Sequence, residues 1–208
     1  MIGSDDDMSR IAEQLTFEDR QEPKQILEVA QGLQHPQSLF DLRADEAARW
    51  QEYLKSHPEL DMDGAAGNEE PLGSWPSQPP GETALEVAKD VLSGKPYDRV
   101  HILIIPTTEG FEVPAYLNWG GWNECPPPEI HVAALRKWHE EFGAELIGLS
   151  GDVMNLRVER RPRTRDEAIK LAREQYKYYA DIVDQGMNDI STLAAGLYAS
   201  NWWYFWWD

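Results

Sequence analysis

The C-terminal segment constrains the fold of this 208-residue chain more than any other stretch. Residues 201–208 read NWWYFWWD, and six of these eight residues are aromatic. Trp and Tyr also favour membrane interfaces, but interfacial helices usually carry Lys and Arg, and this segment has neither. Each buried Trp covers a large apolar area and has one indole N–H that needs a partner. We therefore expect a terminal core strand whose aromatic side chains cover both faces of a sheet edge.

The middle of the chain joins a strongly apolar run to an unusual loop. Residues 100–105 read VHILII, which is typical of a buried central strand, and Pro106 removes the next ladder donor. Residues 114–119 predict a second, shorter strand. The following loop, 120–128, contains two glycines and three prolines and is costly to order unless something packs it. We expect the indoles of Trp119 and Trp122 and those of the C-terminus to form one cluster.

The first 81 residues predict short helices followed by a linker. Residues 1–8 carry three consecutive aspartates and no apolar pattern, which is typical of a frayed end. Apolar spacing predicts one helix from residue 9, a second from Pro23 to about residue 33, and a third over residues 44–56. Residues 61–81 are rich in Gly, Pro and acid and read as a linker or an extended strap. Trp75 favours the strap, since an exposed indole forfeits about 2–3 kcal/mol of burial.

Residues 82–208 give more consistent signals. Thr83 and Glu86 form one capping box, which predicts a helix ended by Gly94, and Thr164 and Glu167 form another, which predicts a helix to about residue 185. Helices are also expected over 128–143 and after 188, and strands at 144–149 and 153–159 form a hairpin. We therefore predict an α+β fold with a mixed or antiparallel sheet and helices largely on one face. A short helical N-terminal region (1–60) and the linker or strap (61–81) precede this α+β domain (82–208).

Charge and cysteine content limit the classes of partner. The formal net charge is −18, and residues 1–81 contribute 17 acids and 6 bases, or −11. Such a chain repels nucleic acid and anionic lipid, so we expect no nucleic-acid or membrane partner and suspect a basic protein partner. The acidity could equally serve solubility alone. A single cysteine, Cys125, and the lack of a long apolar run favour a soluble, cytoplasmic protein.

Several stretches of the second half carry a family resemblance. They are NWGGWNECP at 118–126, LRKWHEEFGAE at 135–145, the turn at Asp152, RPRT at 161–164 with its following helix, and the closing WWYFWWD. Together they resemble the bacterial domain of unknown function family numbered 4253, over about residues 100–208. The resemblance implies an α+β module of bacterial or phage origin. It implies no activity and no catalytic residues.

Motifs for catalysis or metal binding are weak in this chain. The stretch 139–141, HEE, begins like a zinc protease motif, but Gly143 stands where the second histidine would be. Cys125 could act as a nucleophile if His101, His131 or His139 came within reach, yet free cysteine is commonly a buried hydrophobe. An acid/base pair of Asp152 and Glu145 competes with the role of Asp152 as a turn former. The sequence thus predicts no cofactor and no metal, and leans against an enzyme.

Two functional hypotheses remain. The first is a non-catalytic acidic interaction protein, such as an immunity or antagonist protein that binds and blocks a basic partner, for example a toxin. The second is a small-molecule-binding protein or a hydrolase with an aromatic pocket around Trp119, Trp122, Cys125 and His139. An arginine island just before the helix at 164 could bind a phosphate, a nucleotide or an acidic surface, or could neutralise acids of the N-terminal helices. It consists of Arg157, Arg160, Arg161, Arg163 and Arg165. The candidate binding residues are Trp119, Trp122, Asn123, Cys125, His139, Arg161, Arg163 and Arg165.

Overall fold

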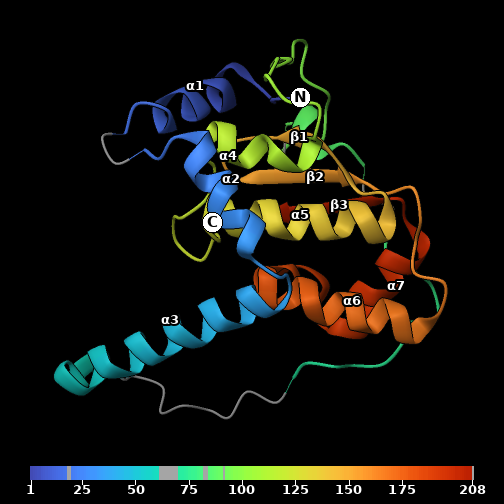
Figure 1. Cartoon of the computed structure of the whole chain (residues 1–208). Coiled ribbons are helices and arrows are strands. Elements are labelled where there is room, and N and C mark those ends of the chain that lie inside the picture. The colour runs from blue at the N-terminus through green and yellow to red at the C-terminus, as the bar shows by residue number, and fades with distance from the viewer. Residues whose placement is uncertain (18–19, 61–69, 82–83, 91, 208) are drawn as a thin grey trace.

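The computed structural model describes residues 1–17, 20–60, 70–81, 84–90 and 92–207 (Figure 1). Its centre is a three-stranded antiparallel sheet in the order β1 (Glu145–Leu149), β2 (Val153–Arg157) and β3 (Trp202–Trp206). Helix α5 (Pro128–Phe142) lies along one face of this sheet. Helices α6 (Arg165–Tyr178) and α7 (Ile190–Ala199) lie next to α5. The predicted α+β class is confirmed, and the sheet is antiparallel.

The C-terminal strand divides its aromatic side chains between two faces, as predicted. Trp203, Phe205 and Trp207 are at most 2% exposed, whereas Trp202, Tyr204 and Trp206 are half-buried on the opposite face. The register pairs Phe205 with Met154 and Trp203 with Leu156. Because alternate residues of a strand face opposite ways, this register places the larger part of the aromatic surface beneath α5.

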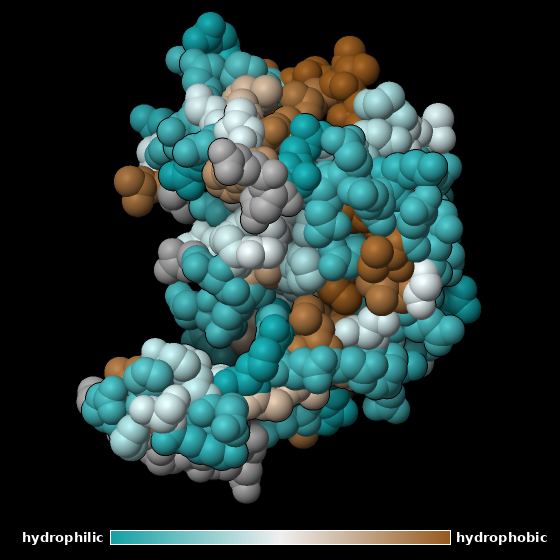
Figure 2. Space-filling model, turned by 60° about the vertical axis from the view of Figure 1, so that its left-hand side comes forward, coloured by the Kyte–Doolittle hydropathy of each residue, from teal (hydrophilic) through white to brown (hydrophobic). Residues whose placement is uncertain are grey.

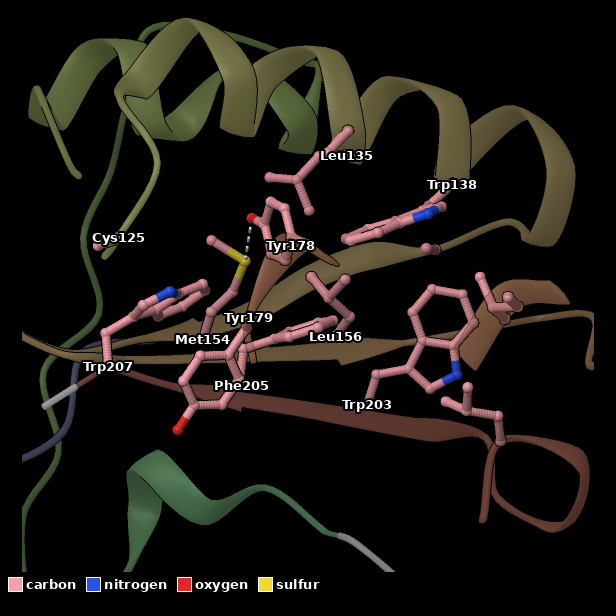
Figure 3. Close-up of a cluster of buried hydrophobic side chains, with 14 of the residues drawn as sticks. Cys125, Leu135, Trp138, Met154, Leu156, Tyr178, Tyr179, Trp203, Phe205 and Trp207 are labelled. Atoms are coloured by element: carbon pink, nitrogen blue, oxygen red, sulfur yellow. Dashed lines mark hydrogen bonds between the residues drawn. The ribbon is translucent and has the colours of Figure 1, made fainter. Parts of the chain in front are cut away.

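The mid-chain loop and the C-terminus form one aromatic cluster, as the sequence predicts. The rings of Trp119 and Trp207 meet edge to face with centroids 5.4 Å apart. Trp138 of α5 stacks on Phe205 at 5.6 Å, and Tyr178 of α6 contacts both Trp138 and Trp207 (Figure 3). Edge-to-face and offset pairs at such distances are the favoured aromatic geometries. The cluster therefore joins the loop, two helices and the last strand in one core.

Capping residues define most of the helices in this half. Pro128 occupies the first turn of α5, and Gly143 ends it with φ of 61°. The Thr164 hydroxyl accepts from the Glu167 amide at the start of α6, and Asp189 caps α7 in the same way. The predicted helix to residue 185 is wrong in length, because α6 ends at Tyr178 and a π-helical turn, η4 (Ile182–Met187), follows. A left-handed Asn188 then redirects the chain into α7.

Two predicted strands are wrong. Residues 100–105 are extended, but of these only His101 makes a bridge, with Ile2, and Ile102 and Ile104 are 78% and 95% exposed. The edge of β1 is instead occupied by Met1, whose carbonyl accepts from the Leu149 amide. Residues 114–119 were expected as a strand, yet α4 (Val113–Leu117) is a helix with proline in its first turn. Strand propensity depends strongly on available partners, so an apolar run alone does not secure a place in a sheet.

Residues 84–90 also depart from the prediction. Thr83 lies outside the described residues, and η2 (Glu86–Ala88) is a single 3₁₀ turn rather than a helix ended by Gly94. The Val87 amide donates to the side-chain oxygen of Asn155, a fully buried residue of β2, at 3.0 Å. This contact covers the face of the sheet opposite α5. A further 3₁₀ turn, η3 (Gly110–Glu112), precedes α4.

The N-terminal region contains α1 (Asp5–Gln14), α2 (Pro23–Gly32), α3 (Gln37–Ser56) and the 3₁₀ turn η1 (Pro58–Leu60). The predicted frayed end is wrong: Ser4 and Asp7 form a capping box, and the three aspartates occupy the first turn of α1, where negative charge is favourable. Helix α2 packs on α5, and α3 begins seven residues earlier than predicted. Residues 70–81 lie along α7 as a strap, with the Ile190 amide donating to the Pro71 carbonyl at 2.8 Å.

The aromatic core provides the first test. We expect Trp203→Ala to lower the free energy of unfolding by about 3–5 kcal/mol, because it removes a buried indole between α5 and β3. Trp50→Ala is the matched control, since this indole is 53% exposed and its loss should change stability by no more than about 0.5 kcal/mol. Urea denaturation measures both values. Equal effects of the two substitutions would contradict the assigned core.

Candidate functional site

The candidate binding residues of the sequence analysis are distributed over three regions. Trp119, Trp122 and Cys125 lie near the N-terminal end of α5, and His139 lies near its C-terminal end. The three arginines at 161–165 lie in a groove beside the strap. Asn123 faces a different groove, between α3 and α6. No single pocket of the described residues contains all of these side chains.

The glycine-rich loop is a structural support for the core. Trp119 is fully buried, and its indole nitrogen donates to the Ser150 carbonyl at 2.8 Å. Gly120 has φ of 114°, and a Cβ there would lie 2.2 Å from the Pro126 carbonyl and 2.7 Å from the His131 ring. Only glycine fits such a backbone and such a close approach. The loop therefore holds Trp119 against the β1–β2 turn, and its partly buried neighbour Trp122 packs edge to face on Trp119.

Cys125 does meet a histidine, but inside the core. Its Sγ lies 3.3 Å from Nε2 of His131, whose Nδ1 hydrogen-bonds to the Tyr178 hydroxyl. Burial raises the pKa of Cys125 well above its usual range and lowers the pKa of His131 to about 3. Both groups are therefore neutral near pH 7, and the thiol is not an activated nucleophile. The pairing of Cys125 with His131 was one of three that the sequence left open.

His139 contacts a carboxylate at the other end of α5. Its Nδ1 lies 2.9 Å from the Glu145 carboxylate, and its ring packs against Phe111. His131 and His139 are eight positions apart, which corresponds to about 12 Å along a helix. His139 therefore does not act on Cys125.

A buried carboxylate forms a network that the sequence analysis missed. Glu174 of α6 is 6% exposed; it accepts from the Trp138 indole at 2.6 Å and from Lys137 at 3.0 Å, and it lies 3.1 Å from His35. Burial opposes the ionisation of Glu174, but the contacts with His35, Lys137 and Trp138 outweigh it and lower the carboxyl pKa. The network connects α6, α5 and the residue just before α3. The sequence signal for this network was Glu174 itself, a charged residue three positions after Leu171 on the buried side of α6.

Helix α3 projects from the body of the protein (Figure 1). Only Leu39 of its 20 residues is fully buried, whereas Phe40, Trp50 and Tyr53 are 38%, 53% and 45% exposed. A groove of about 920 Å³ separates α3 from α6, with Arg43, Trp50 and Tyr176 among its lining residues. Figure 2 shows the far end of α3 as a lobe that stands off the body across a hollow. We call the exposed, stacked aromatic residues Trp50 and Tyr53 the α3 aromatic face.

The arginine island is exposed and lies beside the strap. Arg161 donates to the Ala199 carbonyl at 2.6 Å, and the Arg165 guanidinium carbon lies 4.7 Å from the centroid of the Trp75 ring. Trp75 also meets Tyr198 of α7 edge to face at 6.0 Å. Neutralisation of N-terminal acids, the structural use considered above, is not observed: Arg161, Arg163 and Arg165 make no ion pair with a carboxylate of the described residues.

Potential metal ligands are not clustered in the described part of the chain. It contains no group of three or more His, Cys, Asp or Glu side chains placed to hold a metal ion. None of its helices combines the length and apolarity required to cross a bilayer.

The family resemblance is confirmed. Residues 101–208 match the profile of the family described as Domain of unknown function (DUF4253). The match covers more than half of the chain, so this protein belongs to that family. No curated protein and no solved structure matches it significantly. The matched segment includes the sheet, α4 to α7 and the arginine island, whereas α1 to α3 and the strap precede it.

Burial of Cys125 leads to a reactivity prediction. We expect the native thiol to react with iodoacetamide at least about a hundredfold more slowly than an exposed thiol, because it is both inaccessible and protonated. The control is Ser56→Cys in a Cys125→Ser background, since Ser56 is exposed on α3. Mass spectrometry follows the labelling, and both thiols should react alike in guanidinium chloride. Rapid labelling of Cys125 in the folded protein would contradict the conclusion that its thiol is buried and protonated.

Burial of His131 predicts a pH dependence of stability. In the unfolded chain, His131 takes up a proton below the usual histidine pKa of about 6.5. In the folded chain, it stays neutral down to about pH 3. Stability should therefore fall with decreasing pH, and His131 should contribute about 2 kcal/mol of the loss between about pH 7 and about pH 5. Urea denaturation of the wild type and of His131→Gln at both pH values tests this. An unchanged pH dependence in the variant would contradict it.

Proposed function

We propose that this protein is a non-catalytic interaction protein that binds a basic protein partner through the α3 aromatic face. The observation that carries the proposal is the incomplete burial of α3, a 20-residue helix with one fully buried side chain. Helices in proteins gain most of their stability by packing an apolar face. A bound partner would supply the packing that the body of this chain does not.

The exposed side chains of α3 are of the kind that anchor protein interfaces. Trp50 stacks on Tyr53 with centroids 5.5 Å apart, and Tyr53 stacks on His57 at 4.1 Å. This stacking holds the rings in one orientation before a partner arrives, which reduces the entropy lost on binding. Trp and Tyr are enriched among the residues that dominate binding energy. The α3 aromatic face is thus a pre-organised anchor.

Charge supports a basic partner. Residues 1–81 carry 17 acids and 6 bases, and the whole chain has a net charge of −18. A field of this sign accelerates encounter with a positively charged protein and disfavours acidic competitors. The groove beside α3 is also lined by Glu46, Glu70 and Glu124. Glu46 and Glu70 already pair with Arg43 and Arg173, so within the described residues Glu124 is the lining carboxylate that a basic side chain of a partner would meet.

The environment of Cys125 supports a binding role over a hydrolytic one. The thiol and His131 are both neutral and buried, and His139 lies at the other end of α5, 2.9 Å from the Glu145 carboxylate. An immunity or antagonist protein that blocks a basic toxin fits a chain of this kind, because such a role requires a complementary surface and no chemistry. A free thiol is compatible with the reducing cytoplasm, where we place the complex.

The test is binding to the product of the adjacent gene. We expect a stable complex with this product, and we expect Trp50→Ala to weaken it by about thirtyfold or more, as for a central interface residue. Phe17→Ala is the control, since Phe17 lies outside α3 and is, like Trp50, 53% exposed. Isothermal titration calorimetry measures both affinities. Absence of a complex, or equal weakening by both substitutions, would refute the proposal.

A further inference from the structure

A second surface, independent of the α3 aromatic face, has the features of a small-molecule site. A groove of about 870 Å³ lies between the strap, the segment that leads into α6 and the end of α7. Its lining includes Arg161, Arg163 and Arg165, together with Trp75 and Tyr198. We call these five residues the arginine groove. Small-molecule sites typically have volumes of about 300–1,000 Å³ and combine apolar walls with a few polar groups.

We propose that the arginine groove binds a nucleoside phosphate. Neither the family match nor the proposed partner binding assigns this site, and the proposal does not depend on either of them. Two properties of the groove carry it: guanidinium groups that make no ion pair with a carboxylate of the described residues, and aromatic rings beside them.

The charge of the groove is unusual for this chain. Acids outnumber bases by 37 to 19, yet three arginines within five positions make no ion pair with any carboxylate in the ranges that the structure describes. Glu159 is the one carboxylate among the described lining residues, and it pairs with Arg160 at 3.0 Å. Like charges held close together repel one another unless an anion neutralises them. The structure therefore presents a positive surface that an external anion would stabilise.

The recognition would come from side chains rather than from the start of α6. The start of α6 is already capped, because the Glu167 amide donates to the Thr164 hydroxyl and the Arg163 amide, just before the helix, donates to the Glu167 carboxylate. The guanidinium groups remain exposed. A planar guanidinium donates two parallel hydrogen bonds to phosphate oxygens, which favours phosphate among small anions.

Aromatic rings define the second half of the ligand. The Arg165 guanidinium lies over Trp75, and Tyr198 stands beside the same indole with 42% of its surface exposed. A planar base can stack on such rings, and each stacked base typically contributes substantially to binding. The overall charge of −18 disfavours a long polyanion at this groove. A short phosphate-bearing ligand with one aromatic ring fits both the charge and the size.

The experiment is calorimetric titration of the full-length chain with ATP, with pyrophosphate and with a single-stranded oligonucleotide. We expect saturable ATP binding that weakens with added salt. Arg163→Gln should weaken ATP binding about tenfold, as expected for loss of a charged hydrogen bond. Lys170→Gln is the control, since it makes the same charge change at an exposed position of α6 outside the groove.

A second variant separates the two halves of the ligand. Tyr198→Ala should weaken ATP binding several-fold while leaving pyrophosphate binding within about twofold, because only the base contacts the ring. Failure of both ATP and pyrophosphate to bind would overturn the proposal, as would equal losses in Arg163→Gln and Lys170→Gln. Tighter binding of the oligonucleotide than of ATP would replace the small ligand by a nucleic acid. None of these outcomes bears on complex formation through α3.

Discussion

The packing of the C-terminal strand against α5 is the contact on which the rest of the structure depends. Trp203, Phe205 and Trp207 present one aromatic face, and Trp138 and Tyr178 cover it from two helices. This arrangement uses residues from the end of the chain to close a core that begins with the loop at Trp119. The charged network around Glu174 sits at the edge of the same core, where it connects α6 to the base of α3.

Sequence patterns predicted the elements that are governed by local chemistry. Prolines, capping boxes and glycine placed α2, α5 and the start of α6, and alternation along residues 153–159 identified the hairpin. They failed for the helix expected after Thr83 and Glu86, of which the described residues contain a single 3₁₀ turn, and for the expected frayed end, which is the capped start of α1. They also failed where strand pairing decides the outcome. Residues 100–105 have every local property of a strand, but Met1 occupies the edge of β1 that could have accepted them. Met1 also donates to the Ile147 carbonyl, 146 positions away in the sequence. Local patterns in residues 100–105 therefore cannot show that Met1 takes this edge of the sheet.

The candidate site was predictable in part. The sequence shows the cluster of three arginines, and the isolated Trp75 predicts that its segment packs on the rest of the protein. The contact between them is not visible, because the strap reaches Arg165 only through the fold. For Cys125 and His131, the residue types suggested a nucleophile and its base. The structure does bring them together, but both side chains are buried in the core, where they stay neutral. The carboxylate of Glu174 was missed because helical spacing marks core positions without revealing a compensating lysine and histidine.

The exposed isoleucines of residues 100–105 also affect how copies of this protein behave in concentrated solution. Ile102 and Ile104 project from an extended segment, and such segments tend to pair with the same segment of another molecule. The net charge of −18 keeps molecules apart at low ionic strength, but added salt shortens the reach of that repulsion to about 8 Å at physiological concentration. Colloidal stability of this protein should therefore decline as salt rises, and acidification toward its isoelectric point near 4.6 should promote precipitation.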